Sequence, residues 1–255
     1  MVSTPVTVLV MAADSGLVLL LLAGTRYAAR AQRQATGKRE VVLYVGAGYL
    51  VAWYLLVVFA ARGGVFETTP ETAFPVIGMG IFPPILFGSI LLAIPQFRER
   101  LQRIPLHWLV RIQVYRVVGG LFIVAWLQGD MPAQFALPAG IGDVLIGLAA
   151  PFVARKLAAE GPQRARNTVL VWCALGIADL VVAVSCGLLS APSVLQQLAL
   201  DSPNAAITSY PMVLVPTFAV PVSVLLHIYV IVRLRAVTRA RALPARDLHH
   251  QGAGS

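Results

Sequence analysis

The residues whose side chains could do chemistry are five ionisable groups that interrupt long apolar stretches of the chain. Ionisable groups are rare in membrane-spanning helices, where they usually face the bundle interior and serve proton relays or substrate binding. Two interpretations follow: an ion-pair network that only fixes helix register, or a site that holds a proton or a charged substrate. The candidates are Asp14, Arg116, Asp143, Asp179 and His227.

Neighbouring residues indicate which way these side chains point, because residues four apart share one helical face. Gly147 lies one turn after Asp143, and Gly187 lies two turns after Asp179. Small residues mark close helix contacts in membranes, so both aspartates are expected to face protein rather than lipid. Other residues are expected to support the site by polarity, close packing or helix breaks: Gln113, Gly142, Gly147, Pro84 and Pro221.

Charge and depth decide how these groups can combine. At about 1.5 Å per residue, Asp14, Arg116 and Asp179 lie near the middle of their spans, whereas Asp143 lies in the outer third. Arg116 can pair with Asp143 or Asp179, but three carboxyls face this one deep arginine. Unless His227 is protonated or Arg111 turns inward, at least one aspartate lacks a partner, and a buried acid of that kind is what a proton-coupled carrier needs.

The composition identifies the elements that position these groups. Of the 255 residues, 58% are hydrophobic and only 12% are charged, whereas soluble domains have about 25% charged residues. A helix needs about 20 mainly apolar residues to cross a bilayer, and seven windows meet that requirement. We therefore predict an all-α, single-domain bundle of seven transmembrane helices over 1–241, with a flexible cytoplasmic tail at 242–255. The spans are expected at about 5–25, 41–61, 75–96, 107–128, 136–155, 168–190 and 211–234.

Basic residues predict how this bundle is oriented. The first connection (26–40), the third, the fifth and the tail hold nearly all lysines and arginines, whereas the second, fourth and sixth hold only Arg62. The positive-inside rule then places the amino terminus outside and the carboxyl terminus in the cytoplasm. Arg111 lies close enough to the inner end of its span to reach the surface. The net charge of +9 is attributed to contact with anionic inner-leaflet lipids, and no nucleic-acid partner is expected.

The sixth connection is the longest, and its apolar spacing predicts a short helix over 193–198 that lies in the membrane interface. The two halves of the chain also match in part. Prolines break the third and seventh spans at corresponding positions, which in transporters points to a binding site near the midplane. Two parallel three-helix units joined by the fourth span, a three-plus-one-plus-three repeat, would be similar in layout to the SWEET sugar transporters. A chance alignment of proline-bearing helices is the alternative.

Gly140, Gly142 and Asp143 form the GxGD pattern of intramembrane aspartyl proteases. In that chemistry a second aspartate, here Asp179 or Asp14, shares a proton because two close carboxylates cannot both ionise. The Tyr-Asp and Pro-Ala-Leu elements that accompany the pattern are missing. No span holds a lysine for a retinal Schiff base and no haem or metal motif is present, so no cofactor or metal is expected, and an enzyme is the less favoured class.

A longer set of residues resembles a known family. The run from Arg111 to Arg116, the segments 135–140 and 147–151, and the prolines and His227 of the seventh span are similar to a family of uncharacterised bacterial multi-spanning membrane proteins. The similarity covers roughly residues 95–235. It implies a bacterial inner membrane and supplies no activity.

Together these observations favour a multi-pass carrier in a bacterial cytoplasmic membrane that moves a small molecule, with proton coupling. In this interpretation Asp143 or Asp179 exchanges a proton, while Arg116 holds the other aspartate or an anionic substrate. The partners expected are the lipid bilayer and a small-molecule substrate. The alternatives are a signalling or accessory membrane protein with a structural polar core, and a GxGD-type protease.

Overall fold

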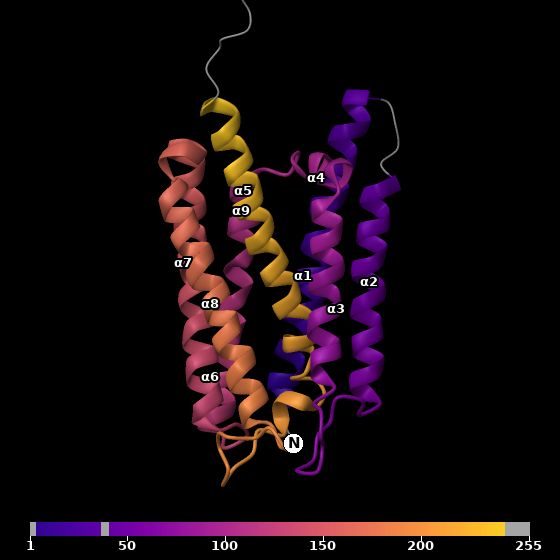
Figure 1. The fold of residues 1–255 in the computed structure, drawn as a ribbon, viewed down its shortest axis with the longest axis vertical. Helices are drawn as coiled ribbons and strands as arrows, with labels where there is room; N and C mark the ends of the chain where they lie inside the picture. Colours follow the sequence, from indigo (N-terminus) through magenta and orange to yellow (C-terminus); the bar gives the residue numbers. More distant parts are fainter. Residues whose placement is uncertain (1–3, 37–40, 243–255) are drawn as a thin grey trace, which may run out of the picture.

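The computed structural model describes residues 4–36 and 41–242, and within these ranges the chain forms a helical bundle without β-strands (Figure 1). Most helices run along the long axis, and the connections gather at the two ends. The helices are α1 (Thr4–Thr36), α2 (Val41–Arg62), α3 (Ile77–Ala93), α4 (Pro95–Leu101), α5 (Leu106–Arg111), α6 (Gly120–Leu127), α7 (Ala133–Arg164), α8 (Arg166–Ser190) and α9 (Val220–Ala242). Three segments have other helical geometries: η1 (Ile112–Gly119) and η2 (Ala206–Thr208) are 3₁₀-helices, and η3 (Val215–Ala219) is a π-helix.

Six helical segments are long and apolar enough to cross a membrane, which identifies the chain as a membrane protein by length and composition. A helix also lies in the remaining expected window, 75–96, but α3 has only 17 residues. The described structure is therefore all-helical as predicted. The six segments are Val6–Ala31, Leu43–Arg62, Leu106–Leu127, Ala133–Arg164, Arg166–Ser190 and Val215–Val237.

Several connections differ from the sequence prediction. Helix α1 continues to Thr36 through most of the expected first loop, because its alanines and arginines favour a helix as strongly as apolar residues do. Between α7 and α8 a kink at Gly161, with φ of 78°, replaces a longer loop. The short helix expected over 193–198 is wrong: this stretch consists of turns and bends. Beyond Ala242, the expected tail lies outside the described residues.

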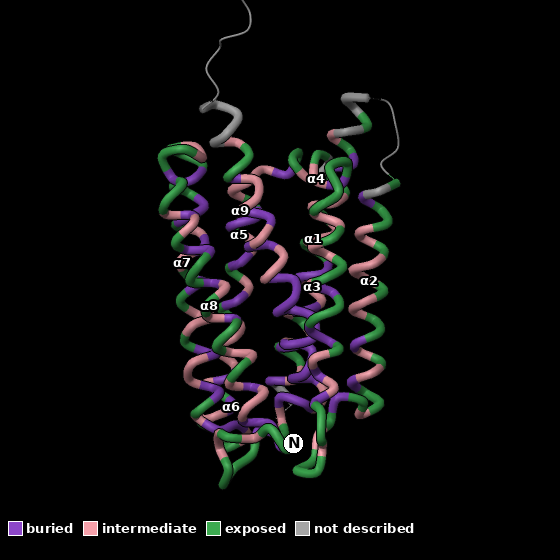
Figure 2. Tube along the Cα trace, viewed as in Figure 1, coloured by how far each residue is buried: buried purple, intermediate pink, exposed green. Residues whose placement is uncertain are grey.

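The segment that ends in α9 lies at the centre of the bundle. Two thirds of its most apolar window (67%) is buried, against 11% for α2, which lies at the periphery. Figure 2 shows the buried residues gathered along α9 and the helix surfaces turned toward it, while α2 is mostly exposed or intermediate. Helix α9 packs against α3, α5 and α8, so side chains from both sides of the bundle can meet there.

Two segments near the centre depart from α-helical geometry. The apolar segment Leu106–Leu127 changes to the 3₁₀-helix η1 between α5 and α6, and the segment Val215–Val237 begins with the π-helix η3. Pro221 has no N–H to donate to the Thr217 carbonyl one turn earlier, and Trp53 Nε1 of α2 donates to that carbonyl at 3.1 Å instead. Helix α3, by contrast, continues through Pro83 and Pro84, so the expected break in the third span is wrong.

Candidate functional site

Arg116 is the centre of a buried polar cluster. Its side chain projects from η1 and only 2% of its surface is exposed. Nε donates to Asp143 Oδ1 on α7 at 2.7 Å, and Nη2 donates to Asp179 Oδ2 on α8. Nη1 donates to the Gly176 carbonyl at 3.3 Å and lies 3.2 Å from His227 Nε2 on α9.

The sequence allowed Arg116 to pair with either Asp143 or Asp179, and the structure pairs it with both. The guanidinium has five N–H donors in a planar fork. Four of these donors face acceptors within the protein. These contacts tie η1 to α7, α8 and α9. An anion that approached this arginine would meet two aspartates that already offset its positive charge.

Asp143 lies three residues farther from the start of its helix than from the expected start of its span. Helix α7 begins at Ala133, three residues before the expected start of the span, because Pro132 forms its N-cap. Asp143 is therefore about 15 Å from that end of the bundle at 1.5 Å per residue, which is close to the depth of Asp14 on α1 and Asp179 on α8. All three carboxyls lie near one level.

Two glycines of α7 permit the close approach of helices around Arg116. A Cβ at Gly142 would overlap the Asp179 carboxylate, and a Cβ at Gly147 would lie 2.7 Å from the backbone nitrogen of Val117. Larger side chains at these positions would push α8 or η1 away from α7. The prediction that small residues line the protein-facing surface near Asp143 is met at both positions.

His227 is fully buried and contacts Arg116 and Trp172. Its ring centre lies 4.8 Å from that of Trp172, at an interplanar angle of 55°. Because Arg116 can only donate, Nε2 of His227 must accept, so the imidazole is neutral with its proton on Nδ1. His227 therefore supplies no positive charge to offset the third carboxyl, and Arg111, on α5, is exposed.

Asp14 is the carboxyl that remains without a partner. Only 3% of its surface is exposed, and its Oδ2 has no hydrogen-bond partner among the described residues. It lines a cavity with about 500 Å³ of empty space together with Arg116, Asp143, Tyr115 and Ser223. We call this the acidic cavity. A buried carboxylate without a counter-charge is costly, whereas a protonated carboxyl costs much less to bury.

Tyr115 and Ser223 line the acidic cavity but were not predicted as site residues. The Tyr115 hydroxyl donates to the Ala219 carbonyl at 3.0 Å and contacts Ser223 Oγ, and Gln113 Nε2 donates to the Ser223 carbonyl at 3.3 Å. These bonds join the 3₁₀ segment to the start of α9. The only sequence signal was the position of Ser223 one turn before His227 on the same helical face.

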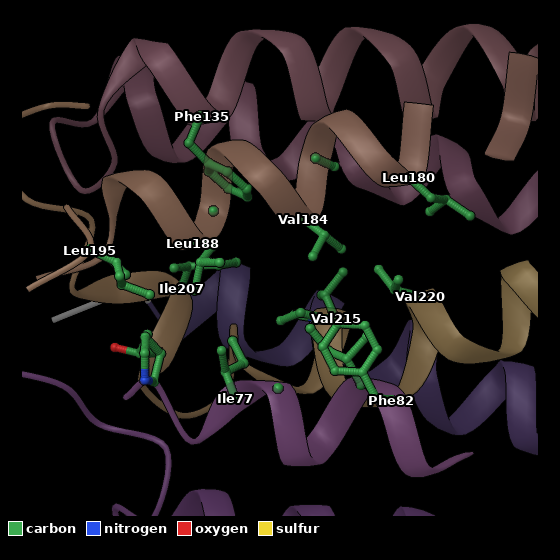
Figure 3. A pocket seen from close by; sticks show the side chains of 18 of the residues that line it. Ile77, Phe82, Phe135, Leu180, Val184, Leu188, Leu195, Ile207, Val215 and Val220 are labelled. Carbon is green, nitrogen blue, oxygen red and sulfur yellow. The ribbon is translucent and has the colours of Figure 1, made fainter. Parts of the chain in front are cut away.

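A second cavity lies beside the acidic cavity, toward the connections between α2 and α3 and between α8 and η3. It has about 870 Å³ of empty space, and Asp143 lines it as well. Figure 3 shows Val184 and Leu188 of α8 facing Ile77 and Phe82 of α3 across it. Almost all of its lining is apolar, so we call it the apolar cavity.

Pro84 and Pro221 are not part of the Arg116 cluster. They line a third cavity, with about 1060 Å³ of empty space, between α1, α2, α3 and α9. Tyr49, Trp53 and Tyr229 are among its other lining residues. The prolines thus act on helix geometry and packing around the centre rather than on the polar groups themselves.

The surroundings of Asp143, the aspartate of the GxGD pattern, differ from those of two aspartates that share a proton. Asp143 and Asp179 both bind Arg116, whose guanidinium stands between them. A positive charge there allows both carboxylates to ionise, whereas a catalytic pair needs one shared proton and room for water and a peptide bond. The arrangement favours an ion-paired core over a protease.

A family model described as Domain of unknown function (DUF8737) matches residues 73–235, which is more than half of the chain. The chain belongs to this family. The match confirms the resemblance to an uncharacterised family that the sequence indicated. Within DUF8737 the matched range contains Arg116, Asp143, Asp179 and His227, whereas Asp14 precedes it. No curated protein and no solved structure matches the chain significantly.

Proposed function

We propose that this DUF8737 protein is a membrane carrier that exchanges a proton at Asp14 as it moves a small molecule through the acidic cavity. One observation carries the proposal: Asp14 is buried, it lines a cavity beside an ion-paired arginine, and its Oδ2 has no partner among the described residues. Among the buried polar atoms that lack a partner in the described residues, the Asp14 carboxyl is the acidic one, and a carboxyl in such a place is much less costly to bury with a proton than without.

The charge balance assigns separate tasks to the three aspartates. Asp143 and Asp179 are held by Arg116, so their charges fix the arrangement of η1, α7 and α8. Asp14 has no fixed counter-charge and can accept a proton in one state and release it when the cavity becomes hydrated or binds a cation. This changes the sequence-based hypothesis, which gave the proton to Asp143 or Asp179.

The proposal includes seven spans, with α3 as the short one. Its 17 residues extend about 26 Å at 1.5 Å per residue, which is near the 30 Å thickness of a hydrocarbon core. The two ends of the bundle, which Figure 1 shows, differ in the charge of the residues that they carry. Arginines of α1, α4, α7, α8 and α9 gather at the end that carries α4, and acidic side chains predominate at the other. The acidic residues at that other end are Glu67, Glu71, Asp130 and Asp201.

This asymmetry supports the orientation with the amino terminus outside and the carboxyl terminus in the cytoplasm of a bacterial cell. The basic end would then contact anionic headgroups of the inner leaflet. The parallel three-plus-one-plus-three repeat stays a prediction.

One of two irregular segments, η3, supplies the movement that a carrier requires. The 3₁₀-helix η1 holds Arg116, and the π-helix η3 precedes Pro221 and contributes Val215 and Ala219 to the acidic cavity wall. Both geometries are less regular than an α-helix and are frequent at functional hinges. Rearrangement of η3 would change access to Asp14 while the Arg116 ion pairs hold η1, α7 and α8 together.

The test is proton uptake by liposomes that contain the purified protein, driven by a potassium diffusion potential and followed with an internal pH-sensitive dye. Wild-type protein is expected to take up protons faster than empty liposomes. Asp14→Asn is expected to abolish the difference, because an amide is nearly the same size and cannot exchange the proton.

Glu71→Gln is the matched control for the change from carboxyl to amide. Glu71 lies in an exposed connection, where a hydrogen bond from Thr69 holds the pKa of its carboxyl below the usual range. This variant therefore loses a negative charge at a residue that does not line the acidic cavity, and it is expected to keep the wild-type rate. If the wild type is no faster than empty liposomes, or if Asp14→Asn retains its rate, the carrier proposal fails and a structural or signalling role of the ion-paired core is favoured.

A further inference from the structure

The apolar cavity and the acidic cavity lie next to each other and share part of their walls. Both are lined by Phe122, Asp143, Leu180, Val215 and Val220, so together they occupy one stretch of the bundle interior. Asp143 stands at the junction with its side chain 13% exposed, and Asp14 lies in the inner part.

The outer part of this space reaches the bundle surface. Phe82 of α3 lines the apolar cavity and yet is 66% exposed, so the cavity opens where this helix would face lipid. Leu195, between α8 and η3, lines its other end (Figure 3). A molecule with a hydrophobic body can enter such a space from the bilayer, where hydrophobic molecules partition, with little loss of apolar contact.

The charges select the sign of the ligand. Two carboxyls, those of Asp14 and Asp143, line the acidic cavity. Arg116 offsets only one of the two carboxylates that it binds, and His227 accepts a hydrogen bond and is neutral. An anion would find the guanidinium already bound to two aspartates. A small hydrated cation would have to cross the apolar cavity, where few polar groups could replace its water shell.

We propose that the adjoining cavities bind an amphipathic organic cation, with its hydrophobic part in the apolar cavity and its positive charge between Asp14 and Asp143. The aromatic rings of Phe122 and Tyr115 in the cavity wall add favourable contacts for an organic cation. The inference rests on the proposed function in its use of Asp14: the organic cation and the proton compete for that carboxyl.

The experiment is equilibrium binding of radiolabelled tetraphenylphosphonium to the protein in nanodiscs, with empty nanodiscs as the blank. Unlabelled octyltrimethylammonium, octanesulfonate and octanol then compete, because they share one chain and differ in charge. The cation is expected to displace the label, and the anion and the alcohol are not.

Two variants test the two parts of the site separately. Asp14→Asn is expected to weaken binding about tenfold, the effect of losing one charge-assisted contact. Val184→Trp fills the apolar cavity without touching a charge and is expected to weaken it by a similar factor. The controls are Glu71→Gln for the charge and Leu145→Trp, at a 62% exposed position of α7, for the added volume. Each variant is first checked for monodispersity and thermal unfolding.

The inference is overturned if wild-type nanodiscs bind no more label than empty ones, if octanesulfonate competes as well as the cation, or if a folded Val184→Trp variant binds like wild type. Failure of this proposal and failure of the carrier proposal are distinguishable. Proton uptake without cation binding would refute only the ligand class, whereas saturable cation binding without proton uptake would refute only the carrier.

Discussion

Replacing Arg116 with leucine removes the only positive charge in the described cluster. The substitution leaves the carboxylates of Asp143 and Asp179 buried without a counter-charge and leaves the Gly176 carbonyl without its donor. Removing one partner of a buried ion pair typically costs about 3–5 kcal/mol, because the remaining charge stays desolvated. Each 1.4 kcal/mol is about a tenfold change in an equilibrium constant. The ratio of folded to unfolded protein should therefore fall by roughly two to four orders of magnitude.

The assay is reversible unfolding in mixed micelles with increasing dodecyl sulfate, followed by far-ultraviolet circular dichroism. The compensated variant Arg116→Leu, Asp143→Asn, Asp179→Asn separates lost charge balance from lost shape. Neutral amides need no counter-charge, so this triple variant should recover most of the loss. The reasoning is refuted if Arg116→Leu alone costs less than about 1 kcal/mol, which is typical of an exposed pair, or if the triple variant is no more stable than the single one.

Three further outcomes follow from the packing around the cluster. Gly142→Ala should lower the free energy of unfolding by about 1–3 kcal/mol, because the added methyl group would overlap the Asp179 carboxylate. Gly48→Ala has open space around it and should stay within about 0.5 kcal/mol of wild type. Equal thermal shifts for the two variants would contradict this. Trp53→Phe should lower the free energy of unfolding by about 1–3 kcal/mol in the dodecyl sulfate assay, since it leaves the Thr217 carbonyl without its donor. An unchanged stability would mean that water or another group replaces the indole. Tyr115→Phe should accelerate amide hydrogen exchange at the start of α9, where the hydroxyl binds the Ala219 carbonyl; unchanged exchange there would show that this bond does not hold η1 to α9.

The positions of the helices could be predicted from the sequence because a long apolar window is a local property. Their ends could not, because the arginines of α1 favour a helix as well as apolar residues do, and the helix runs on to Thr36. Because the helix ends were uncertain, the distance of each site residue from the end of its helix was uncertain too. The fifth span was expected to start at 136, whereas α7 begins at Ala133, so Asp143 is about 4.5 Å farther from the helix start than expected.

The members of the polar cluster could be predicted from the sequence, but not which carboxyls bind Arg116 and which one does not. Residue types and helical faces brought Arg116 together with Asp143 and Asp179, and the charge count left one carboxyl over. Only the three-dimensional arrangement identifies that carboxyl as Asp14. Tyr115 was missed because it binds the Ala219 carbonyl at the end of a π-helix, and periodicity in the sequence does not reveal a π-helix or a 3₁₀-helix.

The central claim is that Asp14 holds an exchangeable proton inside the bundle. Infrared difference spectra of the reconstituted protein, recorded between acidic and alkaline buffer, detect the carbonyl band of a protonated carboxyl directly. The account predicts a band that is present in wild type and in Glu71→Gln and absent in Asp14→Asn. A buried-carboxyl band that persists unchanged in Asp14→Asn, or the lack of any such band in wild type, would contradict it.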